Sequence, residues 1–252
     1  MIYCTFILPI LIPIIFILLT NWCALKKEEY PEIKIEKKKY LKTYLIIYTI
    51  SLISNMIFSY FRSNIYESIV FNIVLSLLVP LSYIDWKTSL IPNRISSALF
   101  IIGICTVSHN YFNQNNYLFY TYNEQIISFV IMSISFLILY FISRGGVGMG
   151  DVKLISSLAL LFNVNGITLT LFISSFFVIV YNTIVSIIYK KRISELPNNE
   201  IKLSDVEEKI EGRILGISII NGRPSITMGP FISIAFVITA IFSNMFFTWL
   251  WG

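Results

Sequence analysis

Residues 125–154 read QIISFVIMSISFLILYFISRGGVGMGDVKL, and this stretch decides the fold class. From residue 125 to residue 143 it carries no Asp, Glu, Lys or Arg. A helix of roughly 20 apolar residues spans the ~30 Å hydrocarbon core of a bilayer. We therefore predict a membrane-spanning helix here, which ends at a glycine-rich segment leading to Asp151.

Similar uncharged stretches occur along the whole chain of 252 residues, of which 56% are hydrophobic and 13% are charged. Soluble domains are about 45–50% apolar and about 25% charged. This composition excludes a disordered chain, a nucleic-acid-coating protein and an ordinary soluble domain. We expect an all-α polytopic membrane protein with about eight transmembrane helices. The predicted spans are residues 2–25, 43–61, 67–84, 95–111, 125–143, 152–163, 166–189 and 228–250.

The basic residues predict the orientation in the membrane. All Lys and Arg residues except Arg62 lie in four loops, at residues 26–42, 85–94, 144–153 and 190–223. Cytosolic loops of membrane proteins carry the excess of Lys and Arg. We therefore predict that these four loops are cytosolic and that both termini lie outside. The net charge of +5 then reflects topology, and no nucleic-acid partner is expected.

The chain divides into four predicted parts. Residues 1–66 form a two-helix membrane segment with a short basic cytosolic loop, and residues 67–189 form the core. Residues 190–227 form a cytosolic loop subdomain, in which Ser204 and Glu207 match a capping box and Asn221-Gly222 matches a hairpin turn. Residues 228–252 form a C-terminal transmembrane helix.

One predicted span, residues 152–163, is too short to cross a bilayer at 1.5 Å of rise per residue. A break at residues 163–166 follows it. Irregular backbone at membrane depth is tolerated where it lines a cavity inside the protein. The short span therefore draws attention to the glycine-rich residues 145–151 that precede it.

Metal and cofactor sites are not expected. The chain has three cysteines, Cys4, Cys23 and Cys105, without a C-x-x-C pair, and a single histidine, His109. This set supports neither a disulfide framework nor a zinc site.

Two acids stand apart from the rest of the 14. The others lie in the two large cytosolic loops or at outer helix ends, whereas Asp85 and Asp151 lie at the cytosolic boundary, each in a predicted loop. Ionisable groups at membrane depth are functional hypotheses by default. Asp85 is alternatively an interface residue beside the anchors Trp86 and Lys87.

Asp151 follows four glycines within residues 145–150, and glycine permits close approach of another backbone. It is alternatively the N-cap of the next helix, and Gly146 with Gly150 alternatively forms a small-residue helix contact. Lys153 either extends its ammonium group to the interface or shifts the pKa of a nearby carboxyl group. Taken together, the two aspartates suit aspartic peptide hydrolysis, in which a close pair shares one proton.

The sequence resembles the type IV prepilin peptidase family of membrane aspartic proteases. The family carries one catalytic Asp six residues before I-P-N, which matches Asp85 and Ile91-Pro92-Asn93. The second lies in G-x-G-D-V-K-L, which matches Gly148–Leu154 with Asp151. A third marker, G-P-F at the start of the last helix, matches Gly229–Phe231.

The resemblance implies an aspartic endopeptidase with Asp85 and Asp151 as catalytic residues. It implies that the other motif positions support the active-site loops: Gly148, Gly150, Lys153, Pro92 and Asn93. The implied substrates are prepilins or pseudopilins of type IV pili or type II secretion. Their short basic leaders would be cleaved at the cytosolic face of a prokaryotic inner membrane.

Many members of the family also methylate the new pilin N-terminus and carry a tetracysteine insertion between the first two spans. The corresponding loop, residues 26–42, is short and has no cysteine. We therefore do not expect methyltransferase activity.

Two other functions stay open at this point. A presenilin or signal-peptide-peptidase type of protease also uses G-x-G-D, but it pairs this motif with Tyr-Asp, where this chain has Tyr83-Ile84-Asp85. An ion-coupled transporter would use buried carboxylates and broken helices in two repeats. The segment 152–163 is one such helix, and no second one matches it.

Overall fold

The structure is a computed structural model, and it describes residues 12, 14–16, 18, 40–61, 65–113, 120–143, 147–194, 217–220 and 223–251. Across these ranges the chain is helical apart from one short hairpin. The helices are α2 (Tyr40–Phe61), α3 (Ile65–Thr88), α4 (Asn93–Phe112), α5 (Tyr122–Ile142), α6 (Met149–Ala159), α7 (Val164–Ser194) and α9 (Gly229–Trp251). The strands are β1 (Ile217–Ile220) and β2 (Arg223–Ile226).

Each predicted span from residue 43 onward coincides with a helix of the structure. Within the described ranges, four helices are long and apolar enough to cross a membrane: α3, α4, α5 and α7. Two more, α2 and α9, contain shorter apolar stretches, Leu45–Phe58 and Gly229–Phe242. Most of the predicted span 2–25 lies outside the described residues, so the total of about eight spans stays a prediction.

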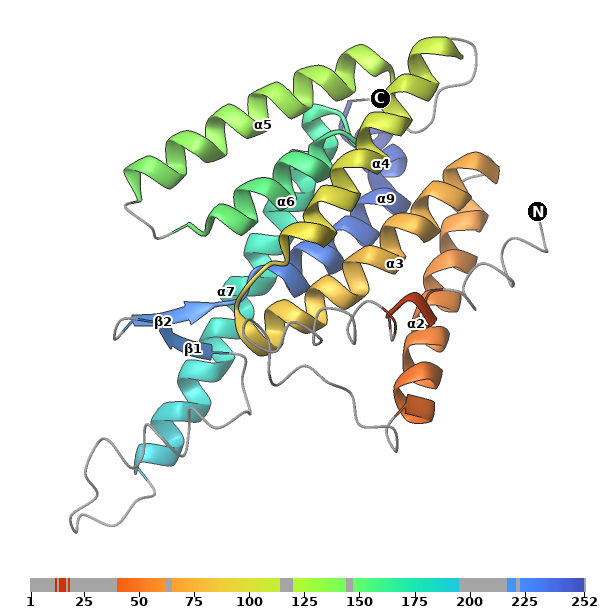
Figure 1. The fold of residues 1–252 in the computed structure, drawn as a ribbon. Coiled ribbons are helices and arrows are strands. Elements are labelled where there is room, and N and C mark those ends of the chain that lie inside the picture. Colours follow the sequence, from red (N-terminus) through yellow and green to blue (C-terminus); the bar gives the residue numbers. More distant parts are fainter. Residues whose placement is uncertain are drawn as a thin grey trace.

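The helices form a bundle in which α9 packs against α3 and α7, and α6 packs against α4 and α5 (Figure 1). A run of aromatic rings links three helices in its core. Phe58 of α2 stacks on Phe71 of α3 at 4.2 Å between ring centroids. Phe71 in turn lies 6.3 Å from Phe236 of α9. Large apolar side chains also cover outward faces, notably on α5, as expected for helices that meet lipid.

The short sixth helix is confirmed, although it ends earlier than the predicted span 152–163. It has 11 residues, and this length corresponds to roughly 16 Å at 1.5 Å per residue. A turn separates it from α7, where the side-chain Oδ1 of Asn163 accepts a 2.8 Å hydrogen bond from the backbone N–H of Gly166. This contact caps the start of α7 and explains the predicted break.

The predicted hairpin is confirmed. Strands β1 and β2 pair in antiparallel register with Ile220 opposite Arg223, and residues 221–222 lie outside the described residues. Strand β2 ends at Ile226, and α9 begins at Gly229. The hairpin therefore leads directly into the N-terminus of α9. The predicted capping box at residues 204–207 lies outside the part of the chain that the structure describes.

Candidate active site

Asp85 lies within α3 and not in the loop predicted after it. The helix continues to Thr88, because the chain turns out of it only at Ser89, whose φ of 54° is left-handed. The N–H of Ser89 donates to the carbonyl of Asp85 at 2.7 Å. The helical pattern thus includes Asp85 in its last turn, and the side chain is only 3% exposed.

The carboxyl group of Asp85 is held by the first residue of α9. The backbone N–H of Gly229 donates to Asp85 Oδ2 at 2.8 Å, in a buried contact. A Cβ at position 229 would lie 2.7 Å from the same oxygen, closer than such atoms normally approach. A glycine is therefore the residue that permits this contact.

Asp151 lies in the first turn of α6, so it is also helical rather than in a loop. The N-cap is Gly148, which corrects the alternative that Asp151 caps the helix. The Asp151 carboxyl group bonds instead to the backbone of Gly148.

Burial raises the pKa of Asp151 from 3.8 to about 6, and the backbone hydrogen bond from Gly148 opposes this rise. The charged form loses hydration inside the bundle, so the group holds its proton to a higher pH than an exposed aspartate does. Asp151 is thus able to carry a proton close to neutral pH.

The two motif segments meet in the structure. Gly150 lies so near Ile91 that a Cβ on the glycine would be 2.9 Å from Ile91 Cβ. Lys153 Nζ donates to Asn93 Oδ1 at 2.9 Å, which joins α6 to the start of α4. The charges of Asp85 and Asp151 interact electrostatically. The residues predicted from two distant motifs therefore form one site.

The supporting residues have different roles in this site. Pro92 is buried, and it is the N-cap residue of α4 with φ −65°, so it shapes the backbone of the turn. Asn93 and Lys153 are exposed, and Gly148 is exposed at the start of α6. Gly146, the partner of Gly150 in the alternative helix contact, is not among the described residues.

Gly229 is the contact that sequence reasoning did not place at the site. The G-P-F marker at residues 229–231 singled out this position, but nothing local in the sequence pairs it with Asp85. The signal was the marker itself, a glycine and a proline at the start of an apolar helix. Its partner becomes visible only when α9 packs on α3.

The arrangement supplies two interacting carboxyl groups, each of which accepts a hydrogen bond from a glycine backbone at a helix N-terminus. One such group in its ionised form is able to accept a proton from water, while the other donates one. Over the described ranges, no group of three or more His, Cys, Asp and Glu side chains is placed to hold a metal ion.

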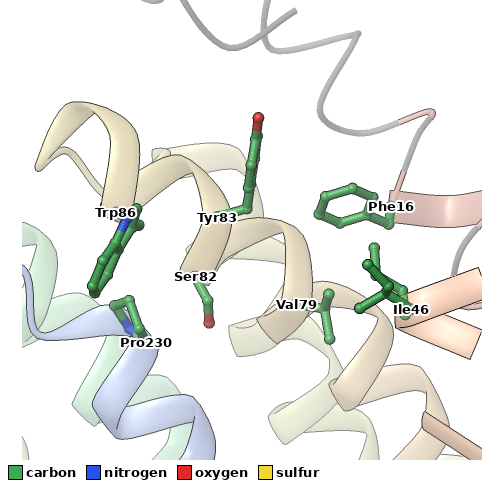
Figure 2. Close-up of a pocket in the computed structure, with 8 residues that line it drawn as sticks. Phe16, Ile46, Val79, Ser82, Tyr83, Trp86 and Pro230 are labelled. Atoms are coloured by element: carbon green, nitrogen blue, oxygen red, sulfur yellow. The ribbon is translucent and has the colours of Figure 1, made fainter. Parts of the chain in front are cut away.

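An apolar pocket of about 360 Å³ is lined by residues next in sequence to those of this site (Figure 2). Trp86 and Pro230, the sequence neighbours of Asp85 and Gly229, line one end of it. Phe16 and Ile46 line the other end, with Val79, Ser82 and Tyr83 between them (Figure 2). The end of α3 therefore carries a buried carboxyl group on one face and an apolar pocket on the neighbouring face.

These features define a class, a helical membrane protein with an acid pair of the kind that aspartic hydrolases use. Residues 72–183 match the family model described as the type IV leader peptidase family. This segment contains both aspartates, and over it the chain is similar to that family. No curated protein and no solved structure gave a match.

Proposed function

We propose that this protein is an aspartic endopeptidase that removes the short basic leader of type IV prepilins or pseudopilins at the cytosolic face of the inner membrane. The observation that carries the proposal is the meeting of the two motif segments, through Gly150 with Ile91 and Lys153 with Asn93. The two contacts bring the start of α6, which carries Asp151, against the turn that follows Asp85. The electrostatic interaction of Asp85 with Asp151 supports their pairing.

In the proposed mechanism, Asp85 is the ionised member of the pair and Asp151 is the protonated member. Asp85 takes a proton from water, and the water oxygen attacks the scissile carbonyl carbon. Asp151 donates its proton to the carbonyl oxygen. The C–N bond then breaks, the proton on Asp85 passes to the leaving amine, and one hydroxyl of the tetrahedral intermediate returns its proton to Asp151 as the new carboxyl group forms.

We propose that the substrate arrives laterally, because prepilins insert through a hydrophobic N-terminal helix. The apolar pocket beside Trp86 and Pro230 supports an approach along α3, since it offers an apolar surface next to Asp85. Gly148 is exposed and carries no side chain at the start of α6, which favours close approach of an extended peptide backbone.

Processing should leave the new N-terminus unmethylated. The loop of residues 26–42 has no cysteine that could build the insertion found in bifunctional members of the family. Mass spectrometry of the mature product tests this point separately from cleavage. A methylated N-terminal residue would contradict it.

The test of cleavage is co-expression with a prepilin whose leader ends in glycine, followed by a gel-shift assay. Asp85→Asn and Asp151→Asn should each abolish processing, because each removes one carboxyl group of the pair while keeping its shape. Asp205→Asn is the matched control, since it makes the same change in the loop subdomain, and it should process normally. Processing at the wild-type rate by either of the first two variants would refute the aspartic mechanism.

The same assay separates the two alternatives. A presenilin-like protease would cut within the apolar helix of a substrate, so the product mass would show a cut beyond the leader. A transporter would leave the prepilin intact, although both aspartates are present. Cleavage should also be insensitive to metal chelators, because the proposed mechanism uses carboxyl groups alone.

A further inference from the structure

We infer that Gly229 is a positioning residue, which fixes the orientation of the Asp85 carboxyl group and is required for catalysis although it provides no side chain. The inference rests on the proposed function. It assigns a role to the start of α9, which lies outside the segment that matches the leader peptidase family.

A backbone hydrogen bond from Gly229 holds the carboxyl group of Asp85. The N–H of Gly229 donates to Asp85 Oδ2 at 2.8 Å, and the contact is buried. The first N–H groups of a helix have no partner within the helix, and they point at the residue that faces its N-terminus. The end of α9 thus offers Asp85 a donor of fixed direction, and the positive end of the helix dipole favours an anionic oxygen there.

The space around Gly229 leaves no room for a side chain. A Cβ at residue 229 would lie 2.7 Å from Asp85 Oδ2 and 3.1 Å from its Cγ. A real side chain would therefore push the carboxyl group away from the N–H or move α9 away from α3. Glycine is required here for close approach, since the residue begins a regular helix.

The N–H of Gly229 is held in place and cannot follow a displaced Asp85 carboxyl group. Ser233 Oγ donates to the carbonyl of Gly229 at 2.8 Å. Ser82 Oγ of α3 donates to Ser233 Oγ at 2.7 Å. The first turn of α9 is thereby fixed to α3 one turn before Asp85, so the Gly229 N–H keeps its aim at Oδ2.

It follows that Gly229 selects which oxygen of Asp85 acts on the substrate. Oδ2 is occupied by the backbone N–H, so Oδ1 is the oxygen assigned to the water. A displacement of about 1 Å in a catalytic group is enough to reduce a rate by roughly 100-fold. Gly229 should therefore control the chemical step more than the binding of substrate.

The test is Gly229→Ala in the full-length protein, purified in detergent and assayed with a prepilin substrate. We expect kcat to fall by roughly 100-fold, while KM changes by less than about 2-fold. Thr239→Ala is the control, because Thr239 is buried in the same helix α9, more than two turns after Gly229, so the change adds no atom near Asp85 and leaves the Ser82–Ser233–Gly229 bonds in place. It should keep its kcat within about 3-fold of wild type.

A thermal-unfolding cycle provides a second readout that does not depend on activity. Gly229→Ala should lower Tm in the wild-type background and lower it clearly less in the Asp85→Ala background, where Oδ2 and Cγ are absent. Equal Tm shifts in the wild-type and Asp85→Ala backgrounds would contradict the contact between Gly229 and Asp85. A normal kcat for Gly229→Ala would overturn the positioning role, whereas a wild-type protein that cleaves no prepilin would refute the proposed function instead.

Discussion

Glycine backbone, rather than polar side chains, surrounds the acid pair. Asp85 accepts from the N–H of Gly229, and Asp151 bonds to the backbone of Gly148. Gly148 has the same steric limit as Gly229 in milder form, since its Cβ would lie 3.0 Å from Asp151 Oδ2. A backbone donor has no rotamers, so it holds a carboxyl group in one orientation without losing side-chain entropy. The glycines therefore contribute by permitting close approach of their backbone to the two carboxyl groups.

Gly150 is the glycine whose role is most directly tested by a second-site change. Gly150→Ala places a Cβ about 2.9 Å from Ile91 Cβ, so α6 must shift relative to the Ile91-Pro92-Asn93 turn. We expect cleavage to slow by roughly 10- to 100-fold, because Asp151 moves with α6. A prepilin cleavage assay with purified protein measures the rate.

The double variant Gly150→Ala with Ile91→Gly is the decisive companion to that measurement. The atom that the new methyl group would meet at 2.9 Å is Ile91 Cβ, and glycine at position 91 removes it, so the double variant should recover part of the lost rate. Ile91→Gly alone serves as the control for the loss of the Ile91 side chain. A fold-loss of cleavage rate in the double variant equal to the product of the fold-losses in the two single variants would show that the two residues do not interact as described.

The raised pKa of Asp151 predicts a pH dependence with a definite sign. The folded protein holds this proton up to about pH 6, whereas an ordinary aspartate releases it near 3.8. The native state therefore binds more protons in this window, and the free energy of unfolding falls as pH rises through it. Asp151→Asn lacks this group, so its Tm relative to wild type should increase across the window. A constant difference would contradict the burial of Asp151.

At the scale of the helices, the sequence predicts positions well and ends less well. Uncharged stretches located the described helices α2 to α7 and α9, because lipid excludes charge from a span. The same rule ended the third span at Ile84, one residue before Asp85, whereas α3 continues until Ser89 adopts a left-handed φ. Charge marks where a helix leaves lipid, and backbone conformation marks where it ends.

The site shows the same division between local and long-range information. The contacts of Asp151 with Gly148, three residues before it, are local, and the G-x-G-D pattern indicates them. The bond from Gly229 to Asp85 joins α9 to α3 across most of the core. No spacing rule within one sequence predicts it, because it depends on which helices pack together.

The short α6 depends on the cap that separates it from α7. Asn163→Ala removes the oxygen that accepts the Gly166 N–H at 2.8 Å. Loss of such a cap destabilises a helix start by about 1 kcal/mol, so Tm should fall modestly while cleavage continues. Asn163→Asp keeps an acceptor and should restore most of the stability. An unchanged Tm for Asn163→Ala would show that the break between α6 and α7 does not need this cap.

At the scale of the whole molecule, polar groups are gathered inside the bundle. Asn72 of α3 donates to Asn55 of α2 at 2.9 Å, and Asn110 of α4 donates to Gln125 of α5 at 2.9 Å. All four side chains are buried, whereas Ile and Phe side chains are exposed on outward faces. Such an arrangement suits a bundle surrounded by lipid, where hydrogen bonds between helices replace those to water.

The orientation of this bundle rests on the basic residues, and single cysteines test it. In a background where Cys4, Cys23 and Cys105 are replaced, Asn116→Cys lies in the predicted outer connection between α4 and α5, and Asn198→Cys lies in the predicted cytosolic subdomain. A membrane-impermeant maleimide should label the first in intact cells and the second only after permeabilisation, because positive loops stay in the cytosol. The reverse pattern would place Asp85 and Asp151 on the outer face, where a leader still in the cytosol could not reach them.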